Sequence, residues 1–144
     1  MRHEDVETVH RLGVDAEPFH TSEQEAEHSP FRPKDCLHDW VDSDDILLVD
    51  EHDDELRGFV LTSRHEPTGQ LTINNIYVKE QYRREGIASA LLEECLHQAD
   101  AHGVRYVVAH TKPDNEPTQA LLDTHGFRRG EAFLWMEQFR DKDA

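Results

Sequence analysis

A β-type run followed by a basic, glycine-containing turn gives this chain its clearest chemical motif. The run Ile73–Val78 precedes Arg83-Arg-Glu-Gly-Ile-Ala88, which opens a long helix-patterned segment. The first turn of a helix presents unpaired N–H groups at the positive end of the helix dipole. Gly86 lets backbone approach a ligand without a Cβ, and the guanidinium groups of Arg83 and Arg84 suit phosphate oxygens. The segment predicts a phosphate site, although an ordinary capped helix after a surface arginine pair has the same pattern.

A second polar group follows the apolar run Val104–Thr111. His110 lies at the end of this run, and Asn115 stands five residues later as a possible N-cap of a helix over Asn115–His125. An imidazole is a suitable proton acceptor at neutral pH, so His110 is a candidate general base. The chain has 11 histidines, however, and a structural or merely exposed role for His110 is the alternative.

The pattern around these motifs predicts one α+β unit without internal repeats. Helical spacing of apolar residues predicts four helices, at 3–12, 34–41, 86–101 and 115–125. β-rich runs predict strands at 46–50, 57–63, 71–78 and 104–111, and two more about Gly130 within Phe127–Phe139. The polar stretch Asp15–Pro33 lacks periodicity and is predicted to be a loop.

The charge balance is strongly acidic. Across 144 residues, 31 Asp and Glu face 15 Lys and Arg, a formal net charge of −16. Such a surface repels nucleic-acid phosphates and anionic membranes, so neither is an expected partner. The chain has only four lysines, which together with the surplus of carboxylates indicates a surface adapted to high salt. An ordinary acidic surface is the alternative.

Several classes of protein are not favoured by the sequence. No apolar run approaches the roughly 18 residues of a membrane span, and no apolar leader follows Met1. Cys36 and Cys95 are too few for a disulfide framework, so a cytoplasmic location is expected. The histidines lack metal-ligand spacing, and we predict no metal.

The motifs together resemble those of the GNAT N-acetyltransferase superfamily. Arg83, Gly86 and Ala88 match its Arg-x-x-Gly-x-Ala pyrophosphate loop, and Ile76-Tyr-Val78 resembles its bulged fourth strand. Asn115 followed by Gly126-Phe127 resembles its second cofactor segment. The resemblance covers about residues 46–139, and it implies that residues 1–144 form one domain with variable N-terminal helices and a loop over 1–45.

This resemblance implies a GNAT fold and an acetyl-coenzyme A (acetyl-CoA) site. The expected fold is a mixed, twisted central sheet, splayed between the family's fourth and fifth strands and flanked by about four helices. Backbone groups of Ile76, Tyr77 and Val78 would pair with the pantetheine arm as an added strand would. Asn115 would bind the pantetheine from the far side. The pyrophosphate would be wrapped, mostly through backbone N–H groups, by Arg84, Glu85, Gly86, Ile87, Ala88 and Ser89, with Arg83 alongside.

The resemblance also implies acetyl transfer to an amine, with one departure at the catalytic site. Where the family often has a tyrosine acid, seven residues after Asn115, this chain has Leu122. His110 lies where some relatives place a catalytic glutamate. The expected function is N-acetyl transfer to a primary amine of a small molecule or peptide. A non-catalytic acyl-CoA-binding module is the alternative, and a homodimer is left open.

Carboxylates in the polar N-terminal stretch point to the charge of the acceptor. Residues 17–28 are rich in glutamate, which favours a cationic amine; a generally acidic surface explains the same residues. The aromatic side chains of Tyr77, Tyr82 and Trp135 are candidate lining residues of the acceptor site, with ordinary packing as the alternative.

Overall fold

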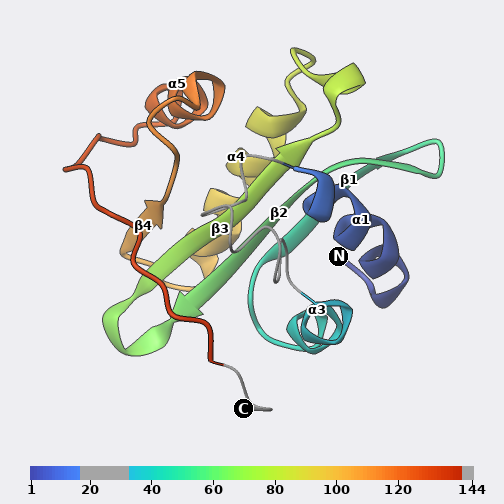
Figure 1. Cartoon of the computed structure of the whole chain (residues 1–144), viewed down its shortest axis with the longest axis horizontal. Helices are drawn as coiled ribbons and strands as arrows, with labels where there is room; N and C mark the ends of the chain where they lie inside the picture. The colour runs from blue at the N-terminus through green and yellow to red at the C-terminus, as the bar shows by residue number, and fades with distance from the viewer. Residues whose placement is uncertain (17–32, 141–144) are drawn as a thin grey trace.

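The computed structural model describes residues 1–16 and 33–140 (Figure 1). Its centre is a four-stranded sheet in the order β1-β2-β3-β4. The strands are β1 (Leu47–His52), β2 (Glu55–His65), β3 (Gln70–Val78) and β4 (Tyr106–Ala109). Neighbours among β1, β2 and β3 are antiparallel, whereas β4 runs parallel to β3. A parallel pair needs a crossover connection, which α4 (Ile87–Ala101) supplies. The predicted mixed α+β sheet is confirmed.

Helices cover both faces of this sheet (Figure 1). Helix α4 packs against β1, β2 and β3 on one face, while α1 (Val6–Asp15) and α3 (Lys34–Val41) pack on the other. Helix α5 (Glu116–Thr124) follows β4. The described residues also form three short 3₁₀ turns: η1 (His3–Asp5), η3 (Glu66–Thr68) and η4 (Glu80–Tyr82). Apart from Asp15, Ala16 and Pro33, the loop predicted over Asp15–Pro33 lies outside the described residues.

Two apolar cores follow from this arrangement. The α4-side core joins α4 and Leu122 of α5 to the sheet; the α1-side core joins α1 and α3 to residues such as Leu47, Phe59 and Leu61. Cys95 lies fully buried on the apolar face of α4, where burial raises the pKa of its thiol to about 11. The thiol therefore stays protonated at neutral pH, as expected for a core side chain.

The sheet opens between β3 and β4. The two strands pair only from Gln70 to Ile73 with Tyr106 to Ala109. Beyond Ile73, β3 continues for five residues, to Val78, with no strand beside it on the β4 side in the described structure. The splay implied by the resemblance therefore lies at Ile73, and it leaves one edge of β3 without a strand partner.

A bulge interrupts β3 just past this point. Leu61 of β2 pairs with Asn75 and Thr62 pairs with Ile73, so that Asn74 has no direct partner. A bulge of this kind adds one residue to one strand and shifts the alternation of the residues that follow. The bulge therefore lies two residues before Ile76–Val78, the stretch whose sequence resembles the family's bulged fourth strand.

The two strands predicted within Phe127–Phe139 are not formed, and that prediction is wrong. Residues 127–140 have no regular secondary structure, and Phe133, Leu134 and Met136 are more than four-fifths exposed. The run Phe133-Leu-Trp-Met136 is apolar at every position, so it lacks the alternation that sorts a strand into a buried and a solvated face. Strand β4 is also shorter than the predicted Val104–Thr111, because only Tyr106–Ala109 pairs with β3.

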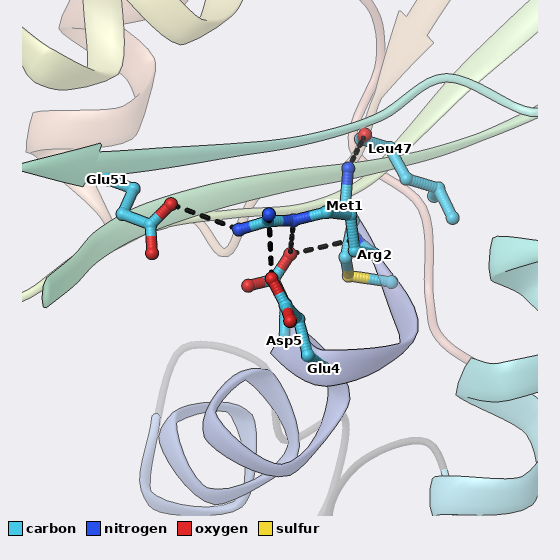
Figure 2. Close-up of polar contacts among 6 residues, drawn as sticks. All are labelled: Met1, Arg2, Glu4, Asp5, Leu47 and Glu51. Atoms are coloured by element: carbon cyan, nitrogen blue, oxygen red, sulfur yellow. Dashed lines mark hydrogen bonds and ion pairs between the residues drawn. The ribbon is translucent and has the colours of Figure 1, made fainter. Parts of the chain in front are cut away.

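The first residues of the chain are tied to β1 (Figure 2). The Met1 ammonium donates to the Leu47 carbonyl oxygen at 2.8 Å, and burial lowers the pKa of this ammonium. The Arg2 backbone N–H donates to Asp5 Oδ2 at 2.8 Å, and the Arg2 guanidinium meets Glu51 at 3.2 Å. These contacts place α1 on the face of the sheet that carries the α1-side core.

Asp5→Ala is expected to lower the free energy of unfolding by about 1–3 kcal/mol, because it leaves the Arg2 N–H without its buried charged acceptor. Asp5 is only 7% exposed. Urea denaturation measures the change. Glu4→Ala is the matched control, because Glu4 pairs with Arg2 while its side chain is 65% exposed. Equal midpoints for the two variants would contradict this account.

Candidate functional site

The turn before α4 presents a row of backbone donors. Arg84 (φ 68°) and Gly86 (φ 81°) both adopt left-handed backbone conformations, and Gly86 is the N-cap of the helix. A Cβ at Gly86 would meet no atom within 4 Å, so the glycine is required by conformation rather than by space. None of the six backbone N–H groups from Arg84 to Ser89 donates a hydrogen bond to another described residue. Alternating left-handed turns and a helix N-terminus together form an anion-binding concavity.

Arg83 is held against β3 and does not project freely. Its Nε donates to the Val78 carbonyl oxygen at 3.1 Å, and its guanidinium carbon lies 5.8 Å from the centre of the Tyr77 ring. These contacts fix the start of the turn relative to the open edge of the strand. Arg84 is exposed, as is Glu85, which is the one acidic residue of the turn.

A polar cluster beneath the turn supports it from β2. The Tyr82 hydroxyl donates to the Glu55 carboxylate, which raises the pKa of Tyr82, and Lys79 Nζ lies 3.8 Å from Glu55. The Arg57 guanidinium pairs with Asp50 at 2.7 Å, and this hydrogen bond raises the pKa of Arg57. Sequence reasoning missed this cluster, because Glu55 and Tyr82 are 27 residues apart and belong to no local motif.

A cavity of about 1360 Å³ fills the opening between β3 and β4. Its walls are β3 from Thr72 to Val78, the turn and first residues of α4, and the segment from Ala109 to Asn115. Part of α5 and part of the C-terminal segment, including Trp135 and Glu137, complete the lining. The cavity exceeds the roughly 300–1,000 Å³ of a typical small-molecule site, so it has room for an extended ligand.

Eleven of the twelve residues that the sequence indicated for cofactor binding or catalysis line this cavity. The exception is Glu85, which is exposed and outside the lining. The lining residues come from four places in the chain: Ile76, Tyr77 and Val78 from β3; Arg83, Arg84, Gly86, Ile87, Ala88 and Ser89 from the turn and α4; His110; and Asn115. The lining residues that the sequence did not indicate include Pro33, next to α3, and Glu137.

Asn115 and His110 lie on the β4 side of the cavity. The Asn115 carboxamide oxygen accepts from the Thr118 N–H at 3.3 Å, which confirms Asn115 as the N-cap of α5. This contact leaves its amide N–H groups for other acceptors. His110 follows β4 directly and is exposed. The candidate acceptor-site aromatics Tyr77, Tyr82 and Trp135 also line the cavity.

Leu122 occupies the position at which the resemblance would place an acidic hydroxyl. Its side chain is 8% exposed and packs in the α4-side core, while an edge of it borders the cavity. An aliphatic side chain has no proton to give. The cavity therefore has anion-binding N–H donors at one end, and an aliphatic side chain at Leu122 where the resemblance implies a tyrosine hydroxyl.

The fold thus combines a mixed sheet, open between β3 and β4, with a row of backbone donors at the N-terminus of α4. The sequence model of the acetyltransferase (GNAT) family matches residues 9–127. The chain therefore belongs to the acetyltransferase (GNAT) family.

Solved structures of N-acetyltransferases share this fold. The PaiA N-acetyltransferase of Thermoplasma acidophilum, solved in complex with coenzyme A, has a TM-score of 0.80 at 18% identity, covering 92% of this chain and 89% of that chain. An aminoglycoside acetyltransferase from an uncultured soil metagenomic sample has a TM-score of 0.73 at 21% identity, covering 96% and 95%. The ribosomal-protein-S18-alanine N-acetyltransferase of Escherichia coli has a TM-score of 0.71 at 18% identity, covering 91% of this chain and 76% of that chain.

Neither a curated sequence relative nor, in the described residues, a metal site or a membrane span is found. No curated protein sequence matches this chain. Within residues 1–16 and 33–140, no three His, Cys, Asp or Glu side chains are grouped so that they could hold a metal ion. No helix in the described part of the chain is long and apolar enough to span a membrane.

Proposed function

We propose that this chain is an acetyl-CoA-dependent N-acetyltransferase that acts on a primary amine of a small molecule or peptide. The observation that carries the proposal is the set of unpartnered N–H groups from Arg84 to Ser89 at one end of the cavity. A diphosphate offers acceptor oxygens for such donors, and the helix dipole favours its charge. The coenzyme A complex of the PaiA enzyme supports this choice of ligand.

The cavity residues fit the remaining parts of acetyl-CoA. The unpaired edge of β3 at Ile76, Tyr77 and Val78 would pair with the amide groups of the pantetheine arm, as an added strand does. Arg83 already binds the Val78 carbonyl, so its part in this proposal is to hold the turn in place beside the strand. Arg84 supplies positive charge, and the amide N–H groups of Asn115 face the pantetheine from the β4 side.

Acetyl transfer would proceed by direct attack of the acceptor on the thioester. The lone pair of a neutral amine forms the N–C bond, the C–S bond breaks, and the sulfur leaves with its electron pair. His110 is proposed as the base that accepts the amine proton, directly or through a water. The thiolate takes a proton from water or from another group in the cavity, because Leu122 cannot supply one. Much of the rate then comes from holding the two substrates in line.

The second candidate function is a non-catalytic acyl-CoA-binding module. The burial of Leu122 in the α4-side core favours it, because the usual acid is replaced by a packing residue. Both functions require the same ligand site, and they differ in whether an amine is consumed.

A thiol-release assay with a panel of primary amines separates the two functions. The enzyme is expected to release free thiol from acetyl-CoA only when an accepted amine is present, and acetyl-CoA alone is expected to raise Tm in both cases. Leu122→Tyr, which adds a hydroxyl at the cavity wall, is expected to raise kcat of an active enzyme. Turnover by Leu122→Tyr together with none by the wild type would favour the binding module.

The domain, its cellular location and its acidic surface belong to the same proposal. We place residues 1–144 in one acetyltransferase domain that works in the cytoplasm. A saline cytoplasm fits the net charge of −16, since dissolved salt screens repulsion between carboxylates over about 10 Å or less. The same screening lets the basic turn attract a polyanion despite the acidic surface.

A further inference from the structure

Asn75 carries a buried polar group that the fold does not use. Its side chain is 9% exposed, and its carboxamide oxygen accepts no hydrogen bond from any described residue. Asn75 also lines the cavity. A carbonyl-type oxygen that is buried without a donor destabilises a fold, so such an oxygen at a cavity wall indicates that a bound ligand supplies the donor.

The bulge at Asn74 determines which side of the sheet Asn75 faces. In a regular strand Asn75 would face the same side as Ile73, whose side chain is in the α4-side core. The bulge shifts the alternation by one residue, so Asn75 pairs directly with Leu61 of the α1-side core. Directly paired residues share a face of the sheet. Asn75 therefore lies on the α1 side, across the sheet from α4.

This placement separates Asn75 from the anion-binding end of the cavity. The unpartnered N–H groups belong to the start of α4, on the opposite face. The cavity passes through the opening between β3 and β4 and is lined on the α1 side by residues such as Pro33, next to α3. A cofactor whose diphosphate lies at α4 thus leaves the α1 side of the opening for the second substrate.

We propose that Asn75 binds the acceptor, and that its carboxamide oxygen accepts an N–H of the acceptor's primary amine. The proposal rests on the proposed function and names one contact within it. The terminal dihedral of asparagine has a broad, twofold energy profile, so the carboxamide turns to meet a donor that enters the cavity. The neighbouring Asn74 differs from Asn75, because its oxygen already accepts a hydrogen bond from Ser63 Oγ at 3.0 Å.

This contact orients the nucleophile and selects its class. A neutral primary amine has two N–H bonds and one lone pair; one N–H donates to Asn75 while the lone pair forms the bond to the acetyl carbon. The second N–H supplies the proton that leaves as the C–S bond breaks, and the departing sulfur keeps the bonding pair and is protonated. An alcohol has a single O–H, which must be lost, so it cannot satisfy Asn75 throughout the step. Asn75 therefore favours amines over alcohols.

Asn75→Leu is the direct test. Leucine has nearly the same size and removes the orphan oxygen, so Tm is expected to stay level or rise. The Kd of acetyl-CoA is expected to be unchanged, while kcat/KM for the amine falls by about 10- to 100-fold, chiefly through KM. Asn75→Asp keeps an acceptor oxygen and is expected to retain kcat/KM within a few-fold of the wild type.

Ser63→Ala is the matched control, because it breaks the contact to Asn74 at the same bulge while Ser63 itself lies outside the cavity lining. It is expected to lower Tm slightly and to leave the amine KM unchanged. Turnover with an unchanged amine KM in Asn75→Leu would overturn this inference and leave the proposed function standing. Absence of turnover by the wild type with every amine would overturn both.

Discussion

Replacing Ala88 by glutamate is expected to raise the Kd of acetyl-CoA by about 100-fold or more. Ala88 is the second residue of α4 and lines the cavity next to the unpartnered N–H groups. A carboxylate there accepts these N–H groups itself and also repels the diphosphate. Two like charges about 4 Å apart near a protein surface repel by about 4 kcal/mol, and a 100-fold change in Kd corresponds to about 2.7 kcal/mol.

The same substitution is expected to stabilise the protein, which separates lost binding from lost folding. A negative charge in the first turn of a helix contributes about 0.3–1 kcal/mol of stability. Calorimetric titration gives Kd, and thermal unfolding without ligand gives Tm. Ala90→Glu is the matched control, because Ala90 is exposed and lies outside the cavity lining although it is only two residues further along α4. Equal Kd values for the two variants would show that the turn does not bind the diphosphate.

The elements that hold the turn were predictable because their signals are local. The apolar spacing of 86–101 gives α4 and its buried face, and Gly86 marks the turn that begins it. Asn115 was recognisable as an N-cap, since a cap depends on the side chain and on the residues that directly follow it. The mixed sheet with a splay was implied by the family resemblance, and the antiparallel and parallel neighbours agree with it.

The contacts inside the site were not predictable, because each joins residues that have no shared motif. The sequence predicts that Arg83 binds phosphate. In the structure its side chain donates instead to the Val78 carbonyl oxygen, just before the left-handed backbone at Arg84. The position of the bulge depends on the pairing of β2 with β3 and is visible only in the register. The bulge moves the Asn75 side chain to the other face of the sheet, and this therefore depends on how β3 pairs with β2.

The C-terminal segment shows the limit of strand propensity. Residues 127–139 are rich in aromatic and apolar side chains, which favour strands. A strand also needs a partner and a face to bury, and β4 offers only a four-residue edge. Phe133, Leu134 and Met136 stay exposed, so the segment borders the cavity without joining the sheet.

His110→Ala is expected to lower kcat/KM for the amine by about 100-fold near neutral pH, the size typical of a lost general base. A neutral imidazole accepts a proton and an imidazolium does not, so a wild-type rate that depends on His110 should fall in acid. The variant should lose this dependence and keep only the one that follows deprotonation of the amine itself.

Two controls make the His110 result specific. His97→Ala removes an exposed imidazole from α4, outside the cavity lining, and should leave the pH profile unchanged. Added imidazole should restore part of the His110→Ala rate, because His110 is exposed at the cavity wall and its removal leaves space for a small base. A pH–rate profile of His110→Ala that matches the wild-type profile would remove this residue from the mechanism, and water would then accept the amine proton.

The rate would in that case come from the positions of the two substrates alone, so the contacts at Asn75 and at the start of α4 would contribute a larger share of it.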